Sequence, residues 1–170
     1  MDFMELLQKR YSVRNYSAKP VEDEKLKKIL EAGRLAPTAV NFQPQKIYVL
    51  KSEEAIAKLR SVTRMAYNAP MALLVCYDNT ISWKAHRFGD DYDGGPMDVD
   101  IVTTMMMLQA TELGLGSLWV RGYRSKDIEE TFELPENIIP VCLLLLGYPA
   151  EENSTSHTTR KPLNETVVEI

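Results

Sequence analysis

The stretch Met71-Ala72-Leu73-Leu74-Val75-Cys76-Tyr77 is an apolar run of strand length without polar alternation, and Pro70 precedes it. Because alternation is missing, both faces of such a strand are covered, as they are at the centre of a sheet that lies between helices. A second apolar run, Val141–Leu146, has the same character. These runs predict strands that are buried on both sides.

The segments on either side of these runs carry helix and strand patterns. Upstream, Glu22–Arg34 has an apolar stripe opposite lysines, and Pro37 stops it. Downstream, Asp98 or Asp100 is expected to cap a methionine-rich helix that runs to Leu113. Further helices are predicted over Asp2–Lys9, Glu53–Arg60 and Lys126–Phe132, and further strands over Lys46–Leu50, Ser117–Arg121 and Pro140–Leu146. The sequence therefore predicts one α+β domain, residues 1–170, with a central mixed β-sheet flanked by helices on both faces.

Length, charge and residue types exclude several classes of protein. The 170 residues fit one domain, and the net charge of −4 argues against a nucleic-acid partner, which needs a clustered basic face. Cys76 and Cys142 lie inside apolar runs, which predicts buried thiols rather than a disulfide. The histidines are His86 and His157 alone, so no Cys/His cluster has metal-site spacing. A charged N-terminus and the lack of an apolar run of about 20 residues predict a cytoplasmic protein without a membrane segment.

Two arginines and a serine alternate in the segment Lys9-Arg10-Tyr11-Ser12-Val13-Arg14. In an extended chain, Arg10, Ser12 and Arg14 project to the same side. Guanidinium groups and a hydroxyl are donors that suit a phosphate. The other interpretation is a solvated basic cap at a helix end.

Two later segments have residue types suited to a flat ligand. Asn41 and Gln43, in the segment Ala36–Pro44, offer amide donors and acceptors for the edge of a heterocycle, although Pro, Thr and Asn also form ordinary turns. Gly114 and Gly116 allow a backbone to approach a ligand closely, but a helix C-cap glycine followed by a packing glycine gives the same pattern.

The polar tail Glu151–Ile170 contains a fourth segment, Arg160-Lys161-Pro162-Leu163. Its two cations are either exposed charges or the completion of a phosphate site with Arg10 and Ser12. The tail ends in apolar Val167 and Val168, which would be buried by packing onto a second subunit; the alternative is a free terminus.

A long irregular segment, Asp78–Pro96, is predicted between two buried elements, and loops of this length are often functional. Its aromatic residues, among them Trp83 and Phe88, either stack on a substrate or pin the loop to the core. His86 and Arg87 lie beside them and could steer an anion.

The four segments, in this order and spacing, resemble the nitroreductase family of FMN-dependent oxidoreductases along essentially the whole chain. The resemblance implies a nitroreductase-like fold and an interlocked homodimer with an FMN site at each side of the interface. A C-terminal arm, residues 151–170, would pack on the partner subunit. The implied activity is ping-pong hydride transfer from NAD(P)H through N5 of FMN to a small acceptor such as a nitroaromatic or a quinone.

The resemblance also implies which residues bind FMN. The phosphate and ribityl chain would be held near the N-terminus and the tail, and the ring would lie along the glycine segment with backbone groups near N5. Thr38, Ala39 and Asn41 would come from the partner subunit. The implied set is Arg10, Tyr11, Ser12, Arg14, Pro37, Thr38, Ala39, Asn41, Gln43, Gly114, Leu115, Gly116, Arg160 and Lys161.

No catalytic side chain is implied, because the cofactor carries the chemistry. Arg14, at the N1/C2 edge of the ring, and Gly116 would tune the flavin. Trp83, His86 and Phe88 would form a substrate lid. The chain departs from the family pattern at Gln45, where an aromatic residue is common, and this affects the pocket floor rather than FMN binding.

Three other functions remain open from the sequence. The chain could be a non-catalytic module that stores or senses FMN, since the binding residues would be the same. It could be a related flavin enzyme that performs dehalogenation or flavin fragmentation, or an unrelated α+β interaction domain.

Overall fold

The central sheet has four strands in the order β1-β2-β4-β3, and neighbouring strands are antiparallel throughout. The computed structural model describes residues 1–150 and 159–170. The strands are β1 (Gln45–Leu50), β2 (Met71–Asp78), β3 (Gly116–Val120) and β4 (Ile138–Gly147). Both central strands, β2 and β4, are almost entirely buried. This confirms the interpretation of the two apolar runs.

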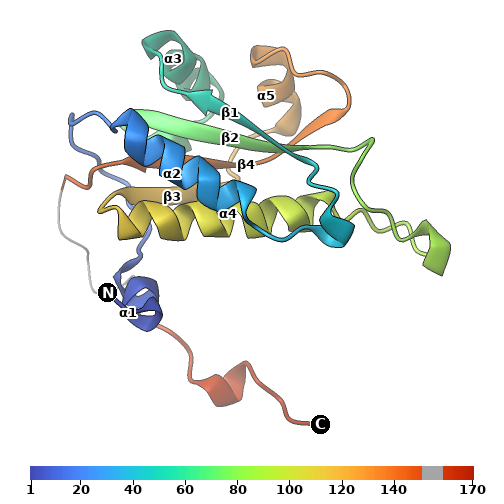
Figure 1. Ribbon diagram of the computed structural model, residues 1–170. Helices are drawn as coiled ribbons and strands as arrows, with labels where there is room; N and C mark the ends of the chain where they lie inside the picture. The colour runs from blue at the N-terminus through green and yellow to red at the C-terminus, as the bar shows by residue number, and fades with distance from the viewer. Residues whose placement is uncertain (151–158) are drawn as a thin grey trace.

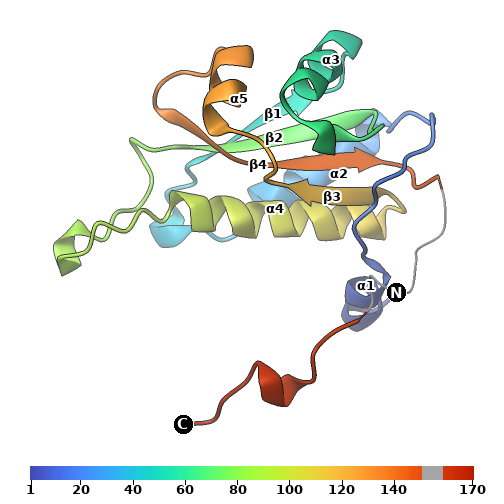
Figure 2. The same cartoon turned by 180° about the vertical axis from the view of Figure 1, so that it is seen from behind.

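Helices cover both faces of the sheet (Figures 1 and 2). On one face lie α2 (Asp23–Arg34) and α4 (Gly95–Glu112), and on the other lie α3 (Glu53–Val62) and α5 (Ser125–Thr131). The core is accordingly divided into two apolar clusters, one on each side of the sheet. The α+β fold is confirmed, and the parallel component that we expected is limited, among the described residues, to a single bridge between Ser12 and Ser117.

Two terminal pieces stand outside this sandwich. The short helix α1 (Phe3–Lys9) begins with a capping box between Asp2 and Glu5 and has no buried residue. The tail from residue 159 contains the short 3-10 turn η5 (Leu163–Glu165) and extends away from the sheet beyond α1 (Figure 1). The predicted arm begins at residue 151, so its first eight residues lie outside the described part of the chain.

The start of α4 differs from the prediction. The helix begins at Gly95 with Pro96 in its first turn, so neither Asp98 nor Asp100 caps it. Proline in the first turn fits because its fixed φ is helical and its missing N–H is not needed there. Asp93 accepts the Gly95 N–H at 2.9 Å, and Asp98 lies inside the helix and is buried.

The segment between β2 and α4 is a hairpin rather than an unstructured loop. Lys84 and Asp93 form an antiparallel bridge, and the 3-10 turn η3 (His86–Phe88) lies at the tip. Trp83 contacts the rings of Phe88 and Tyr92, with centroids 6.4 and 6.5 Å apart. The aromatic residues therefore pack against one another within the hairpin.

The two cysteines are buried and free, as predicted. Burial raises the pKa of Cys76 and of Cys142 to about 12, which keeps both thiols protonated and unreactive at neutral pH. None of the helices in the described part of the chain is both long and apolar enough to span a membrane. The cytoplasmic location stays a prediction.

Candidate cofactor site

A pocket of about 130 Å³ lies where the chain leaving α1 meets the end of α4 and the start of β3. Arg10, Tyr11 and Val13 line one side of it. The other side is formed mainly by the three residues Gly114–Gly116, with Pro149 close by. Segments about 100 residues apart in the sequence thus meet at one small cavity.

The extended segment after α1 is held in place by β3. The Val13 N–H donates to the Ser117 carbonyl at 3.0 Å, and Ser12 pairs with Ser117 in a parallel bridge. Val13 is buried, whereas Arg14 is exposed and its guanidinium donates to the Ser12 carbonyl at 3.2 Å. Ser12 and Arg14 lie next to the pocket residues in sequence but do not line the pocket itself.

Positive charge is concentrated beside the pocket. Partial burial and the nearby Arg160 guanidinium both lower the pKa of Arg10. Two positive charges close together repel each other, and an anion bound between them would relieve this repulsion. Lys161, next in the tail, forms an ion pair with Glu165 at 3.6 Å. The structure therefore brings Arg160, but not Lys161, into electrostatic contact with the Arg10 side of the pocket.

Gly114 and Gly116 each require glycine, for different structural reasons. Gly114 has a φ of +77° and open space where a side chain would be, so its backbone is accessible at the pocket. A Cβ on Gly116 would lie 2.5 Å from Cγ2 of Val13 and 3.0 Å from Cγ of Pro149. Gly114 ends α4 in a left-handed conformation, and Gly116 allows the Arg10 segment to pack against β3.

A second group of candidate residues lies in the loop that contains the 3-10 turn η1 (Ala39–Asn41). Val40, Asn41 and Gln43 all have left-handed backbones, with φ of 54°, 56° and 53°. Such a conformation costs a residue other than glycine about 1–2 kcal/mol, and it is rarest for β-branched residues such as Val40. Strain of this kind gathers at ligand sites.

Hydrogen bonds inside the loop and from α4 hold this conformation. Thr38 Oγ1 accepts the Gln43 N–H at 3.0 Å, and Gln43 Nε2 donates to the Asn41 carbonyl at 3.3 Å. Asp98 Oδ1 accepts the Ala39 N–H at 2.8 Å. The side chains of Thr38 and Gln43 are therefore used within the loop, whereas Asn41 is exposed.

Within one chain, the η1 loop and the Arg10 pocket lie far apart. The η1 loop lies at the N-terminal end of α4, and the Arg10 pocket lies at its C-terminal end (Figure 1). With 18 residues, α4 is about 27 Å long at 1.5 Å per residue. The predicted FMN-binding set therefore forms two half-sites within one chain.

Comparison with known proteins decides the family. The sequence model described as the nitroreductase family matches residues 7–67 and 62–148. The chain belongs to the nitroreductase family.

Relatives in this family cover nearly the whole chain. A nitroreductase family protein from Clostridium difficile 630 is 44% identical, with a TM-score of 0.93 over 99% of this chain and 98% of its own. An FMN-dependent nitroreductase from Clostridium difficile R20291 is 30% identical, with a TM-score of 0.74 over 89% and 90% of the two chains. A Methanothermobacter thermautotrophicus protein, named as an NADH dehydrogenase/NAD(P)H nitroreductase, is 33% identical over 91% of this chain and 81% of its own. The resemblance inferred from the four segments is confirmed.

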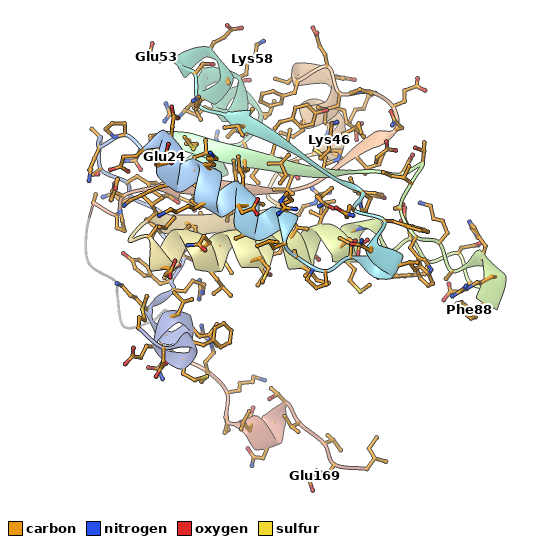
Figure 3. The ribbon with its side chains drawn as sticks, viewed as in Figure 1. Glu24, Lys46, Glu53, Lys58, Phe88 and Glu169 are labelled. Atoms are coloured by element: carbon orange, nitrogen blue, oxygen red, sulfur yellow. The ribbon has the colours of Figure 1, made fainter. Side chains whose placement is uncertain are left out.

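In this nitroreductase-family chain, the predicted lid residues lie on the protruding hairpin. His86 and Phe88 are exposed at its tip, and Trp83 is half-buried near its base. Phe88 stands at the opposite side of the molecule from α1 (Figure 3). The hairpin therefore shares its end of α4 with the η1 loop and not with the Arg10 pocket.

Two residues behind the half-sites were not expected from the sequence. Asp98 was interpreted as a helix cap, but it holds the η1 loop. Lys25 was counted among the solvent-facing lysines of α2, but its Nζ donates to the Leu113 carbonyl and to the Tyr148 hydroxyl, each at 2.8 Å. It thereby ties α2 to the residue before Gly114. No local pattern signals these roles, because the partners are 59 and 88 residues away.

The described residues contain no group of three or more histidine, cysteine or acidic side chains that could hold a metal ion.

Proposed function

We propose that this chain is an FMN-dependent oxidoreductase that takes hydride from NAD(P)H and passes it to a small acceptor such as a nitroaromatic or a quinone. The observation that carries the proposal is the pocket that Arg10 and the accessible backbone of Gly114 line together, with the Arg160 guanidinium near enough to lower the pKa of Arg10. The names of two relatives support it, one as an FMN-dependent nitroreductase and the other as an NAD(P)H nitroreductase.

The residues at the pocket fit one end of FMN. Arg10 and Arg160 suit the phosphate, with Tyr11 and Ser12 beside it and Lys161 next in the tail. Pockets that hold whole small-molecule ligands have volumes of about 300 Å³ or more. At about 130 Å³, the cavity of one chain is too small for the whole cofactor. We therefore expect a second surface to complete the site.

A second copy of the chain can supply that surface. In a two-fold dimer a contact between two different patches occurs twice, so the η1 loop of each copy could complete the Arg10 pocket of the other. Pro37, Thr38, Ala39, Asn41 and Gln43 would then belong to the partner's flavin site.

Exposed apolar side chains support such a dimer. A groove of about 700 Å³ lies between α2 and α4, and Leu35 on its edge is 64% exposed. In the tail, Leu163 and Val168 are 78% and 83% exposed. Large apolar side chains exposed to this extent at the groove and along the tail are consistent with burial against a partner. We assign residues 151–170 to an arm that packs on the partner subunit.

FMN, when bound, supplies the hydride chemistry, and the residues of the chain adjust it. Reduction places negative charge at the N1/C2 edge of the ring, and a fixed cation there stabilises the reduced form. We assign this role to Arg14, whose guanidinium is exposed and held by the Ser12 carbonyl. The N–H groups of Gly114 and Leu115 already donate to the Thr111 and Ala110 carbonyls, so Gly114 would contribute by leaving open space beside its backbone for the ring. Trp83, His86 and Phe88 on the hairpin would cover the acceptor.

Three measurements on the purified protein test this function. FMN should be released on denaturation, NADH or NADPH should bleach the bound flavin without oxygen, and a quinone should support steady oxidation of NAD(P)H. Bleaching without turnover would instead indicate a module that stores or senses FMN. A colourless protein that does not bind added FMN would overturn the proposal.

A further inference from the structure

Asp98 is a carboxylate buried at an unusual place. It lies in the first turn of α4 and is 0% exposed. Burial and the nearby Asp93 carboxylate raise its pKa, although the Ala39 N–H and the helix N-terminus favour its charged form. Its Oδ2 atom has no hydrogen-bond partner among the described residues.

The helix itself does not need this carboxylate. Gly94 is the cap residue, Asp93 already accepts the Gly95 N–H at the α4 N-terminus, and Pro96 lies in the first turn. A buried charge is unfavourable unless its interactions compensate for lost hydration. The interaction that Asp98 makes is with a backbone N–H 59 residues away in the sequence.

That N–H belongs to the strained η1 loop. Ala39 directly precedes Val40 and Asn41, whose backbones are left-handed. The other side-chain hydrogen bonds of the loop, from Gln43 to Thr38 and Asn41, join loop residues to one another, as do the backbone bonds from Asn41 to Thr38 and from Phe42 to Ala39. The Asp98 bond is the side-chain hydrogen bond that fixes the loop to the rigid helix.

We infer that Asp98 is a positioning residue for the flavin site of the partner subunit. Its carboxylate fixes the Ala39 backbone and so presents Thr38 and Asn41 to a flavin bound by the Arg10 of the other copy. The inference rests on the proposed function. It goes beyond it because it makes one buried residue of each chain responsible for the affinity of the partner's site, while the chain's own Arg10 pocket lies at the far end of the 18-residue helix α4, about 27 Å away.

Two substitutions of Asp98 separate this role from a general effect on folding. Asp98→Ala removes the acceptor and should weaken FMN binding to the apoprotein at least tenfold. Asp98→Asn keeps an amide oxygen for the Ala39 N–H and should stay within about threefold of the unsubstituted protein. Asp127→Ala, in the first turn of α5 on the other face of the sheet, is the matched control and should leave FMN binding unchanged. Equal FMN affinity in the Asp98→Ala variant would overturn the inference.

Mixed dimers give a readout that a purely structural role would not produce. A chain with Asp98→Ala and a chain with Arg10→Ala are purified together through two different tags. One of the two sites then combines an intact Arg10 with an intact η1 loop, so the mixed dimer should bind one FMN with normal affinity. At an FMN concentration just high enough to fill this normal site, neither parent homodimer should bind FMN. No recovery in the mixed dimer would show that Asp98 acts within its own chain, which would overturn the inference.

A substitution on the donor side provides a second route if Asp98→Ala does not fold. Ala39→Pro removes the same N–H and leaves the carboxylate in place. Thr38, with φ of −132° and ψ of 158°, already has the extended backbone that a following proline requires. Ala39→Pro should weaken FMN binding and recover one site in the same mixed dimer. Normal FMN binding by the unmixed Ala39→Pro protein would contradict the inference, whereas a starting protein that binds no FMN would instead refute the proposed function.

Discussion

At the scale of single residues, key interactions of the candidate site join residues that are far apart in the sequence. Arg10 and Arg160 are 150 positions apart, yet the second lowers the pKa of the first. No periodicity in the sequence connects them, and the pairing was expected only from two basic segments and a family resemblance. Asp98 was misinterpreted for the same reason, because its partner is not local.

Arg10→Ala should weaken FMN binding by about 1.5–3 kcal/mol, roughly 10- to 100-fold, the usual range for a hydrogen bond to a charged group. Isothermal titration of the apoprotein with FMN measures this. Arg124→Ala is a suitable control, because Arg124 is an exposed arginine at the N-terminus of α5. Equal losses in both variants would argue against a phosphate at Arg10.

Gly116→Ala should destabilise the fold by about 1–3 kcal/mol, because the new methyl overlaps Val13 in a packed core. The overlap is specific, since the added Cβ would lie 2.5 Å from Cγ2 of Val13. The same substitution should therefore cost less in a Val13→Ala background, and urea unfolding of the four proteins measures the difference. Additive effects would mean that Val13 is not the contact that excludes a side chain.

At the scale of elements, local patterns predicted most helices and strands to within one or two residues. Helix α2 and strand β2 have patterns of apolar residues that fix their type and nearly their ends. The predicted start of α4 was wrong. The helix begins at the Gly94-Gly95-Pro96 turn, which Asp93 holds, and so starts before Asp98 and Asp100, the two residues expected to cap it. The hairpin before α4 could not be predicted, since its strand pairing is a single bridge between Lys84 and Asp93.

Asp93 should make the stability of this hairpin depend on pH. Burial alone would raise its pKa, but hydrogen bonds from Lys84, the Gly95 N–H, Ser82 and Tyr77 outweigh that effect and hold the pKa below its usual value of 3.8. A lowered pKa means that the stabilisation is complete well above pH 3.8 and is lost as pH falls through the lower, folded-state pKa.

Asp93→Asn should consequently lower the thermal midpoint at pH 7 and make the hairpin easier to cleave with trypsin at Arg87. The difference in midpoint between the two proteins should shrink as the pH falls below about 4. A difference that stays constant from pH 7 to pH 3 would show that the charge of Asp93 does not hold the hairpin.

At the scale of the whole molecule, we have proposed that one chain is half of a dimer. It has a buried core on both faces of its sheet, yet it leaves apolar side chains exposed on α1, on the edge of the α2–α4 groove and along the tail. The sequence predicted the tail as an arm because the end of the chain is apolar. It could not predict which surface the arm contacts, because that depends on the shape of the folded partner.

Val168→Asp should weaken the dimer, because a charge would replace an apolar side chain that is 83% exposed in the single chain and buried in the proposed assembly. Sedimentation at several protein concentrations measures the dissociation constant, which should rise at least tenfold. Glu169→Lys changes the adjacent residue without adding apolar surface and serves as the control. A monomeric starting protein, or an unchanged constant in Val168→Asp, would contradict the arm.

The position of the two half-sites at opposite ends of α4 has a kinetic consequence. In the proposed dimer, a newly folded chain offers only one end of a cofactor pocket, so capture of FMN would wait for an encounter between two chains. At low protein concentration and with FMN in excess, the rate of flavin uptake after refolding should therefore be second order in chain. Loading of the cofactor would then depend on how fast the chain is synthesised rather than on how much flavin is present.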